Sequence, residues 1–149
     1  MNRISKYLDP ELVAFIDVNT RDEAVHALVD LTYNKSKISD KQAFYTAVIN
    51  REKIVSTGIG MAVAIPHAKL TNFENFFITI GILSKGVDWN TIDDSLVRIV
   101  FMIGGPDDKQ TEYLQILSGI TSVVKDEKRR KQMINASTTQ EVIEILNKF

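Results

Sequence analysis

The chain has 149 residues, of which 44% are hydrophobic and 25% are charged, and its formal net charge is -1. These values are typical of a globular domain, and 18 basic against 19 acidic residues argue against a surface for nucleic acid or an anionic membrane. The lack of cysteine excludes disulfides, thiol catalysis and cysteine-zinc sites. Because the sequence shows no signal peptide and no apolar run of membrane-spanning length, we expect a cytoplasmic protein without membrane insertion.

Two amphipathic helices are expected in the first third of the chain. The first begins with Thr20 and Glu23 in the spacing of a capping box, followed by apolar residues on one helical face. The second has Ser39 and Gln42 in the same spacing and should end near Arg51.

Three β-rich runs follow, at residues 62–65, 76–83 and 96–105. Pro106 ends the third run, and helical periodicity then returns, with an inner stripe formed by Leu114, Leu117, Ile120, Thr121 and Val124. Two short helices complete the chain, the last beginning around Ser137 and Thr138. Helices, then strands, then helices, with no Pro/Gly/Ser linker, predict one α/β domain over residues 1–149, a mixed sheet flanked by helices.

Cofactor and metal sites are not expected. The glycines at 58 and 60 lack the third glycine and the following helix of a dinucleotide loop, so we interpret them as permissive turn backbone. A zinc site needs three or four ligands, but the chain has two histidines and no HExxH motif. One of the two, His26, lies away from the apolar stripe of its helix and should face solvent.

The other histidine, His67, follows a proline at the end of an apolar run. Pro66 fixes its own φ and biases the preceding residue toward extended backbone, so we expect His67 on stiff backbone at the end of the sheet. A neutral imidazole is a nucleophile that can attack a phosphoryl group and hold it as a phosphoramidate. The alternative is a histidine with a structural role in the core or in a turn. Arg51 offers a planar fork for phosphate, unless it only stabilises the end of its helix.

Residues 51–70, REKIVSTGIGMAVAIPHAKL, and 101–120, FMIGGPDDKQTEYLQILSGI, resemble the enzyme IIA component of the fructose/mannitol class of the bacterial phosphoenolpyruvate:sugar phosphotransferase system. The resemblance covers nearly the whole chain, and GIGMAVAIPHAK is its most specific part. It implies a fold like that of the phosphotransferase/anion-transport proteins. It also implies a phosphocarrier in which His67 accepts a phosphoryl group from the phosphohistidine of HPr and passes it to an enzyme IIB cysteine. Arg51 matches the family arginine beside the active histidine.

The same family includes nitrogen-regulatory relatives, which act by binding partners in one phosphorylation state. A regulatory protein as the partner is therefore the alternative to enzyme IIB, although we favour the transport role. For either partner we expect an apolar rim around His67, formed by Ile59, Met61 and Ala68.

One position departs from the family pattern. Where the family usually carries a second histidine, the sequence EYLQILS has Tyr113. A tyrosine can donate one hydrogen bond but carries no positive charge, so Tyr113 either hydrogen-bonds at the site or packs on the third strand. We expect a helix that starts at Asp107 or Asp108 to supply free N–H groups for an anion.

Overall fold

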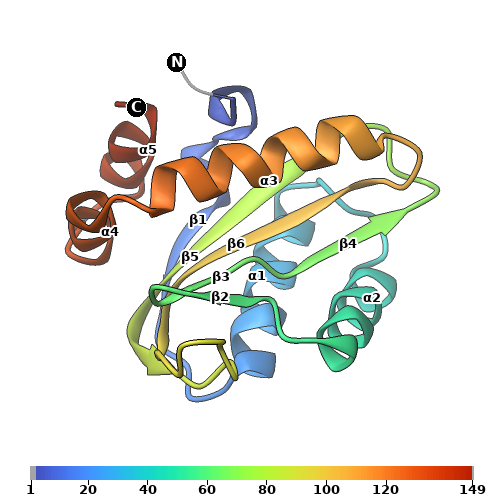
Figure 1. Ribbon diagram of the computed structural model, residues 1–149. Helices are drawn as coiled ribbons and strands as arrows, with labels where there is room; N and C mark the ends of the chain where they lie inside the picture. Colours follow the sequence, from blue (N-terminus) through green and yellow to red (C-terminus); the bar gives the residue numbers. More distant parts are fainter. Residues whose placement is uncertain (1–2, 149) are drawn as a thin grey trace.

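A computed structural model describes residues 3–148 as one six-stranded sheet with helices on both faces (Figure 1). The helices are α1 (Arg21–Asn34), α2 (Lys41–Ile54), α3 (Gln110–Val124), α4 (Glu127–Ile134) and α5 (Thr139–Asn147), preceded by the short 3-10 turns η1 (Ser5–Tyr7) and η2 (Pro10–Leu12). The strands are β1 (Val13–Ile16), β2 (Gly58–Gly60), β3 (Val63–Ala64), β4 (His67–Leu70), β5 (Phe77–Val87) and β6 (Val97–Pro106). The expected α/β fold with a mixed, helix-flanked sheet is confirmed.

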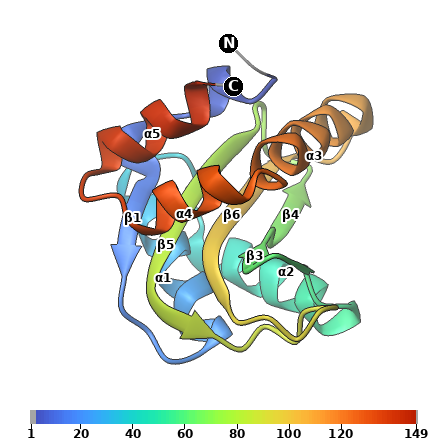
Figure 2. The same cartoon turned by 60° about the vertical axis from the view of Figure 1, so that its left-hand side comes forward.

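The sheet is organised around the antiparallel pair of long strands β5 and β6. Its order is β1-β5-β6-β3-β2, and β4 also pairs with β6. Strand β1 runs parallel to β5, and β3 and β4 run parallel to β6, whereas β2 and β3 form an antiparallel hairpin. Because β3 and β4 pair with successive parts of β6, they form one interrupted strand along it (Figure 2).

Pro66 lies in this interruption and does not end the pairing. A proline has no N–H to donate, but its carbonyl oxygen still accepts from the Ile103 N–H at 3.0 Å. The strand therefore resumes at His67, which lies opposite Ile103 in the register of β4 and β6. The expectation that His67 lies at the end of the sheet is wrong: it begins a further strand.

Alternation along the strands separates two hydrophobic cores. One core lies between the sheet and α1 with α2, where Leu28, Phe44 and Met102 are fully buried. The other lies under α3, α4 and α5, which cover the opposite face (Figure 1, Figure 2). Ile65 belongs to this second core and Ala68 to the first. His67 and Lys69 thus belong to the α3 side of the sheet by the period of two.

The helix caps confirm two expectations and correct one. Thr20 and Glu23 form the capping box of α1, and the Thr138 hydroxyl caps α5 by accepting from the Glu141 N–H. The cap of α2 is Asp40 rather than Ser39, because its carboxylate accepts from the Ala43 N–H at 3.0 Å. This helix also continues past Arg51 to Ile54.

Helix α3 differs from its expected start and inner face. Its N-cap is Lys109, without a side-chain cap bond, so neither Asp107 nor Asp108 begins the helix. Its buried face consists of Tyr113, Ile116, Gly119, Ile120, Val123 and Val124. Leu114 of the expected stripe is instead 52% exposed. On this face the backbone at Gly119 packs closely against Ile4, because a Cβ atom at Gly119 would be 2.7 Å from the Ile4 side chain.

Within residues 3–148, no helix combines the length and the apolar character needed to cross a bilayer.

Candidate functional site

His67 is held by a hydrogen bond between its ring and the backbone of the same segment. Its Nδ1 atom lies 3.0 Å from the carbonyl oxygen of Ile65, and the side chain is half-buried. A carbonyl oxygen can only accept, so Nδ1 carries the proton of the neutral ring. The lone pair of the imidazole is therefore on Nε2.

The surroundings of His67 favour this neutral form. Burial lowers the pKa of His67 below its usual 6.5, and the positive charges of Arg51 and Lys69 lower it further. The bond to Ile65 and the negative charge of Glu52 act in the opposite direction but do not reverse the shift. At neutral pH the side chain consequently offers an uncharged nucleophilic nitrogen next to two cations.

Arg51 reaches the site from the last turn of α2. Its Nη1 atom donates to the carbonyl oxygen of Val55 at 2.9 Å, and Val55 is the C-cap of that helix. Its charge also lowers the pKa of both His67 and Tyr113. Arg51 thus stabilises the end of its helix, and its role toward a phosphoryl group stays a prediction.

Tyr113 packs directly against His67. The two ring centroids are 5.4 Å apart at an interplanar angle of 51°, and the Tyr113 ring also stacks on Phe76 at 6.3 Å. Tyr113 is 5% exposed, and burial raises the pKa of its hydroxyl. Within residues 3–148 this hydroxyl makes no hydrogen bond. The packing role is therefore seen, and the hydroxyl is available for a further partner.

Lys69 lies beside the candidate site, although the sequence did not point to it. It lies two residues after His67 in β4 and hence on the same face of the strand. Its Nζ atom lies 4.3 Å from the centroid of the Tyr113 ring and donates to Gln110 Oε1 at 2.7 Å. The period of two after His67 would have identified Lys69 if β4 had been predicted as a strand.

Glu52 was also missed, because a charged residue on a helix is usually taken to face solvent. It is 3% exposed, and its carboxylate accepts from the backbone N–H and the hydroxyl of Thr57 and from Trp89 Nε1. These bonds tie the end of α2 to the start of β2 and to the loop of residues 88–96. Glu52 therefore fixes the end of α2, which carries Arg51, relative to the backbone that leads into β2.

The hairpin between β2 and β3 has unusual backbone geometry. Met61 and Ala62 both have positive φ, at 60° and 64°, which costs energy in residues other than glycine. The loop of residues 88–96 holds them: Asp93 Oδ2 accepts from the Met61 N–H at 2.9 Å and Ser95 Oγ from the Ala62 N–H at 3.1 Å. Hydrogen bonds from Ser95 and from the Met61 N–H keep the pKa of the Asp93 carboxyl well below its usual range.

The expected apolar rim stays a prediction for two residues and is wrong for the third. Ile59 and Met61 are half-buried on the hairpin and pack against the core under α3, α4 and α5. Ala68 is 6% exposed and packs into the core beside α2, so it cannot contribute. Its neighbour His67 points the other way, since successive side chains of a strand alternate.

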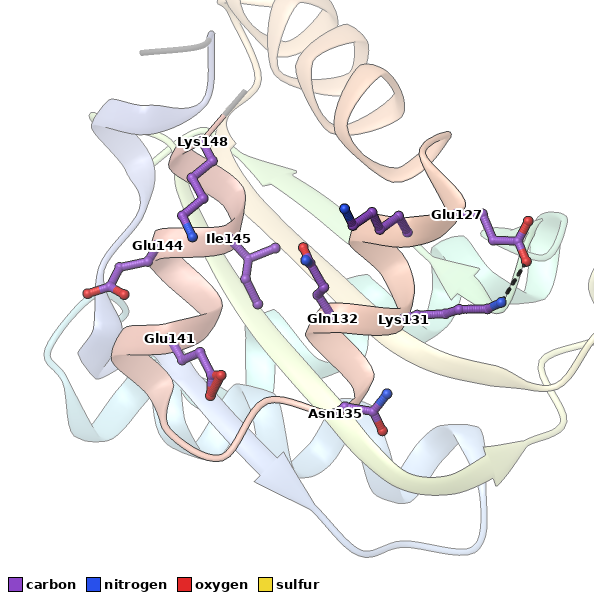
Figure 3. A pocket seen from close by; sticks show the side chains of 9 residues that line it. Glu127, Lys131, Gln132, Asn135, Glu141, Glu144, Ile145 and Lys148 are labelled. Carbon is purple, nitrogen blue, oxygen red and sulfur yellow. Dashed lines mark ion pairs between the residues drawn. The ribbon is translucent and has the colours of Figure 1, made fainter.

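Other polar clusters lie outside this site. His26 is exposed, as expected for a helix surface, and its Nδ1 atom lies 3.3 Å from Asp30 Oδ2. A groove between α4 and α5 (Figure 3) lies at the opposite end of the molecule from β4 (Figure 1). Its rim mixes both charges, contributed by Glu127, Lys128, Lys131, Glu141, Glu144 and Lys148. In the part of the chain that the structure describes, no cluster of three His, Asp or Glu side chains is suited to a metal ion.

A model of the family described as "Phosphoenolpyruvate-dependent sugar phosphotransferase system, EIIA 2" matches residues 6–149. The chain therefore belongs to this family, and the resemblance seen in the sequence is confirmed.

Curated relatives include a fructose-specific PTS component and a nitrogen regulatory protein. The chain is 33% identical over 132 residues to the PTS system fructose-specific EIIABC component of Bacillus subtilis, covering 89% of this chain but only 21% of that protein. It is 25% identical over 146 residues to the "Nitrogen regulatory protein" of Bradyrhizobium diazoefficiens, covering 96% and 94% of the two chains. Relatives of different length and name thus share this domain.

Solved structures share the fold. The nitrogen regulatory protein IIA-Ntr from Neisseria meningitidis superposes with a TM-score of 0.88 at 24% identity, covering 96% of this chain and 98% of that one. The enzyme IIAMTL in a complex with phosphorylated enzyme IIBMTL from Escherichia coli superposes with a TM-score of 0.81 at 19% identity, covering 95% and 98%.

Proposed function

We propose that the protein is a phosphocarrier in which His67 accepts a phosphoryl group from a phosphohistidine of an HPr-like donor and passes it to an enzyme IIB. The observation that carries this proposal is the orientation of the His67 ring. The hydrogen bond to Ile65 occupies Nδ1 and leaves the Nε2 lone pair as the nucleophile, beside the positive charges of Arg51 and Lys69.

The transfer needs no proton to leave His67. The Nε2 lone pair forms the new P–N bond as the P–N bond of the donor breaks, and the bonding electron pair stays on the donor imidazole, which becomes neutral. The His67 ring keeps its Nδ1 proton and takes over the positive charge of the donor ring. The Ile65 carbonyl oxygen, 3.0 Å from Nδ1, stabilises that charge by accepting the hydrogen bond.

Arg51 contributes to this step through its charge and geometry. Phosphoryl transfer depends mainly on positioning and on stabilising the negative charge of the equatorial oxygens. A guanidinium can donate to two phosphoryl oxygens at once, and the bond from Nη1 to Val55 limits its motion. Arg51 would therefore bind the phosphoryl group on His67 without having to be ordered first.

The acceptor is expected to be an enzyme IIB, whose cysteine would take the phosphoryl group in sugar uptake. The similarity to a relative named as a PTS system fructose-specific EIIABC component and the fold shared with an IIA in complex with an IIB support this choice. A second candidate is a regulatory role by phosphorylation-dependent partner binding. It is supported by the similarity to a nitrogen regulatory protein over 94% of that protein's length.

The test is incubation with enzyme I, HPr and phosphoenolpyruvate, followed by quantification of protein-bound phosphate. We expect one acid-labile, base-stable phosphoryl group per chain, lost in His67→Ala and in the closer isostere His67→Gln. His26→Ala is the matched control and should be phosphorylated normally. Label that persists in both His67 variants would contradict the proposal.

The same phosphorylated protein separates the two acceptors. Rapid transfer to the cysteine of an added enzyme IIB would support the transport role. A stable complex with a regulatory protein that forms in one phosphorylation state, without loss of the phosphoryl group, would support the regulatory role.

A further inference from the structure

Lys69 is placed at the site by contacts from two elements. The strand period puts it on the same side of β4 as His67, and its ammonium lies over the Tyr113 ring at 4.3 Å from the centroid. That ring is also the one that packs against His67, with 5.4 Å between centroids. The two side chains on β4 thus contact the same aromatic ring of α3.

Among the residues that the structure describes, the positive charge of Lys69 has no negative partner. In residues 3–148 no carboxylate lies within ion-pair distance of its Nζ atom, and its hydrogen bond at 2.7 Å goes to the neutral amide oxygen of Gln110. Arg51 is in the same situation, since its bond goes to the carbonyl of Val55. Two half-buried cations without counter-ions beside one nucleophile indicate a site that is built to receive an anion.

We propose that Lys69 binds the phosphoryl group carried by His67 and supplies a positive charge that Tyr113 cannot provide. This inference rests on the proposed phosphocarrier function. When the P–Nε2 bond has formed, the Lys69 ammonium leaves the Gln110 amide and donates to a phosphoryl oxygen. The exchange is favourable because a charge-assisted bond to a dianion replaces a bond to a neutral amide. Tyr113 serves as the platform over which the ammonium stays while the site is empty.

The test compares Lys69→Met with the wild-type chain, using phosphoramidate as a small phosphoryl donor. In this reaction the donor P–N bond breaks with release of ammonia, and the phosphoryl group is mapped to His67 by mass spectrometry. A small donor removes any contact that Lys69 could make with a partner protein. We expect phosphorylation to be slowed about tenfold or more, the loss of one charge-assisted hydrogen bond. Lys69→Arg, which keeps the charge, should retain most of the rate.

Two control variants separate this role from others. Lys128→Met removes the same charge from the exposed start of α4 and should leave the rate unchanged. Gln110→Ala breaks the link between β4 and α3 while leaving the ammonium free, so it should not slow the reaction. If Lys69→Met is phosphorylated at the same rate as Lys128→Met, Lys69 has only a general electrostatic role. If Gln110→Ala is phosphorylated as slowly as Lys69→Met, Lys69 has only a structural role. If the wild-type chain takes no phosphoryl group on His67, the proposed function itself fails.

Discussion

Removal of the buried carboxylate of Glu52 should destabilise the protein by an amount that follows from its contacts. In Glu52→Ala, the backbone N–H and the hydroxyl of Thr57 both lose the carboxylate that they donate to, whereas Trp89 Nε1 still has the Thr57 hydroxyl as an acceptor at 3.2 Å. Two orphaned buried donors cost about 1–3 kcal/mol each, and a cavity beside Trp89, which is 1% exposed, adds to this. We therefore expect the free energy of unfolding to fall by about 3–6 kcal/mol.

Urea denaturation followed by Trp89 fluorescence measures this loss, because the indole itself donates to the Glu52 carboxylate. Glu52→Gln retains one acceptor oxygen and should lose less than Glu52→Ala. The control Glu144→Ala changes an exposed residue of α5 and should stay within about ±0.5 kcal/mol of the parent. A loss below about 1 kcal/mol for Glu52→Ala would refute the view that this carboxylate holds the site backbone together.

The pKa of His67, followed by NMR, should lie below 6.5, so the neutral nucleophile should still predominate at pH 6.5, and Lys69→Met should raise it. If the rate of phosphorylation already decreases as the pH is lowered toward 6.5, this prediction is contradicted. Arg51→Ala should slow transfer strongly while costing at most about 1 kcal/mol of stability, and Arg51→Lys should restore only part of the rate. An unchanged transfer rate in Arg51→Ala would mean that Arg51 only stabilises the helix end through its bond to Val55. Tyr113→Phe should raise the transfer barrier by on the order of 0.5–1.5 kcal/mol if the free hydroxyl binds a phosphoryl oxygen; identical rates would mean that Tyr113 only packs.

Local sequence signals predicted the elements that are long or have a defined cap. The capping box at Thr20 and the apolar runs of β5 and β6 are such signals, because each depends on nearby residues. The short strands β1, β2 and β4 have no comparable signal. Residues 67–70, HAKL, become a strand because β6 offers them an edge to pair with, which no local pattern contains.

The candidate site was predictable to a similar extent. The Pro-His step after an apolar run drew attention to His67, the helix end before the glycine segment pointed to Arg51, and the family resemblance pointed to Tyr113. Their approach to one another depends on α2, β4 and α3, which are distant in sequence. Lys69 and Glu52 were missed for the same reason, since the direction of each side chain is decided by tertiary pairing and packing.

The most direct test of the central claim is to locate the phosphoryl group on the imidazole. The ¹⁵N-labelled protein is phosphorylated by enzyme I, HPr and phosphoenolpyruvate, and one-bond coupling between nitrogen and phosphorus is measured by NMR. The structure predicts coupling at Nε2 of His67, with Nδ1 still protonated and bonded to the Ile65 carbonyl. Coupling at Nδ1 of His67, or at a nitrogen of His26, would contradict the account.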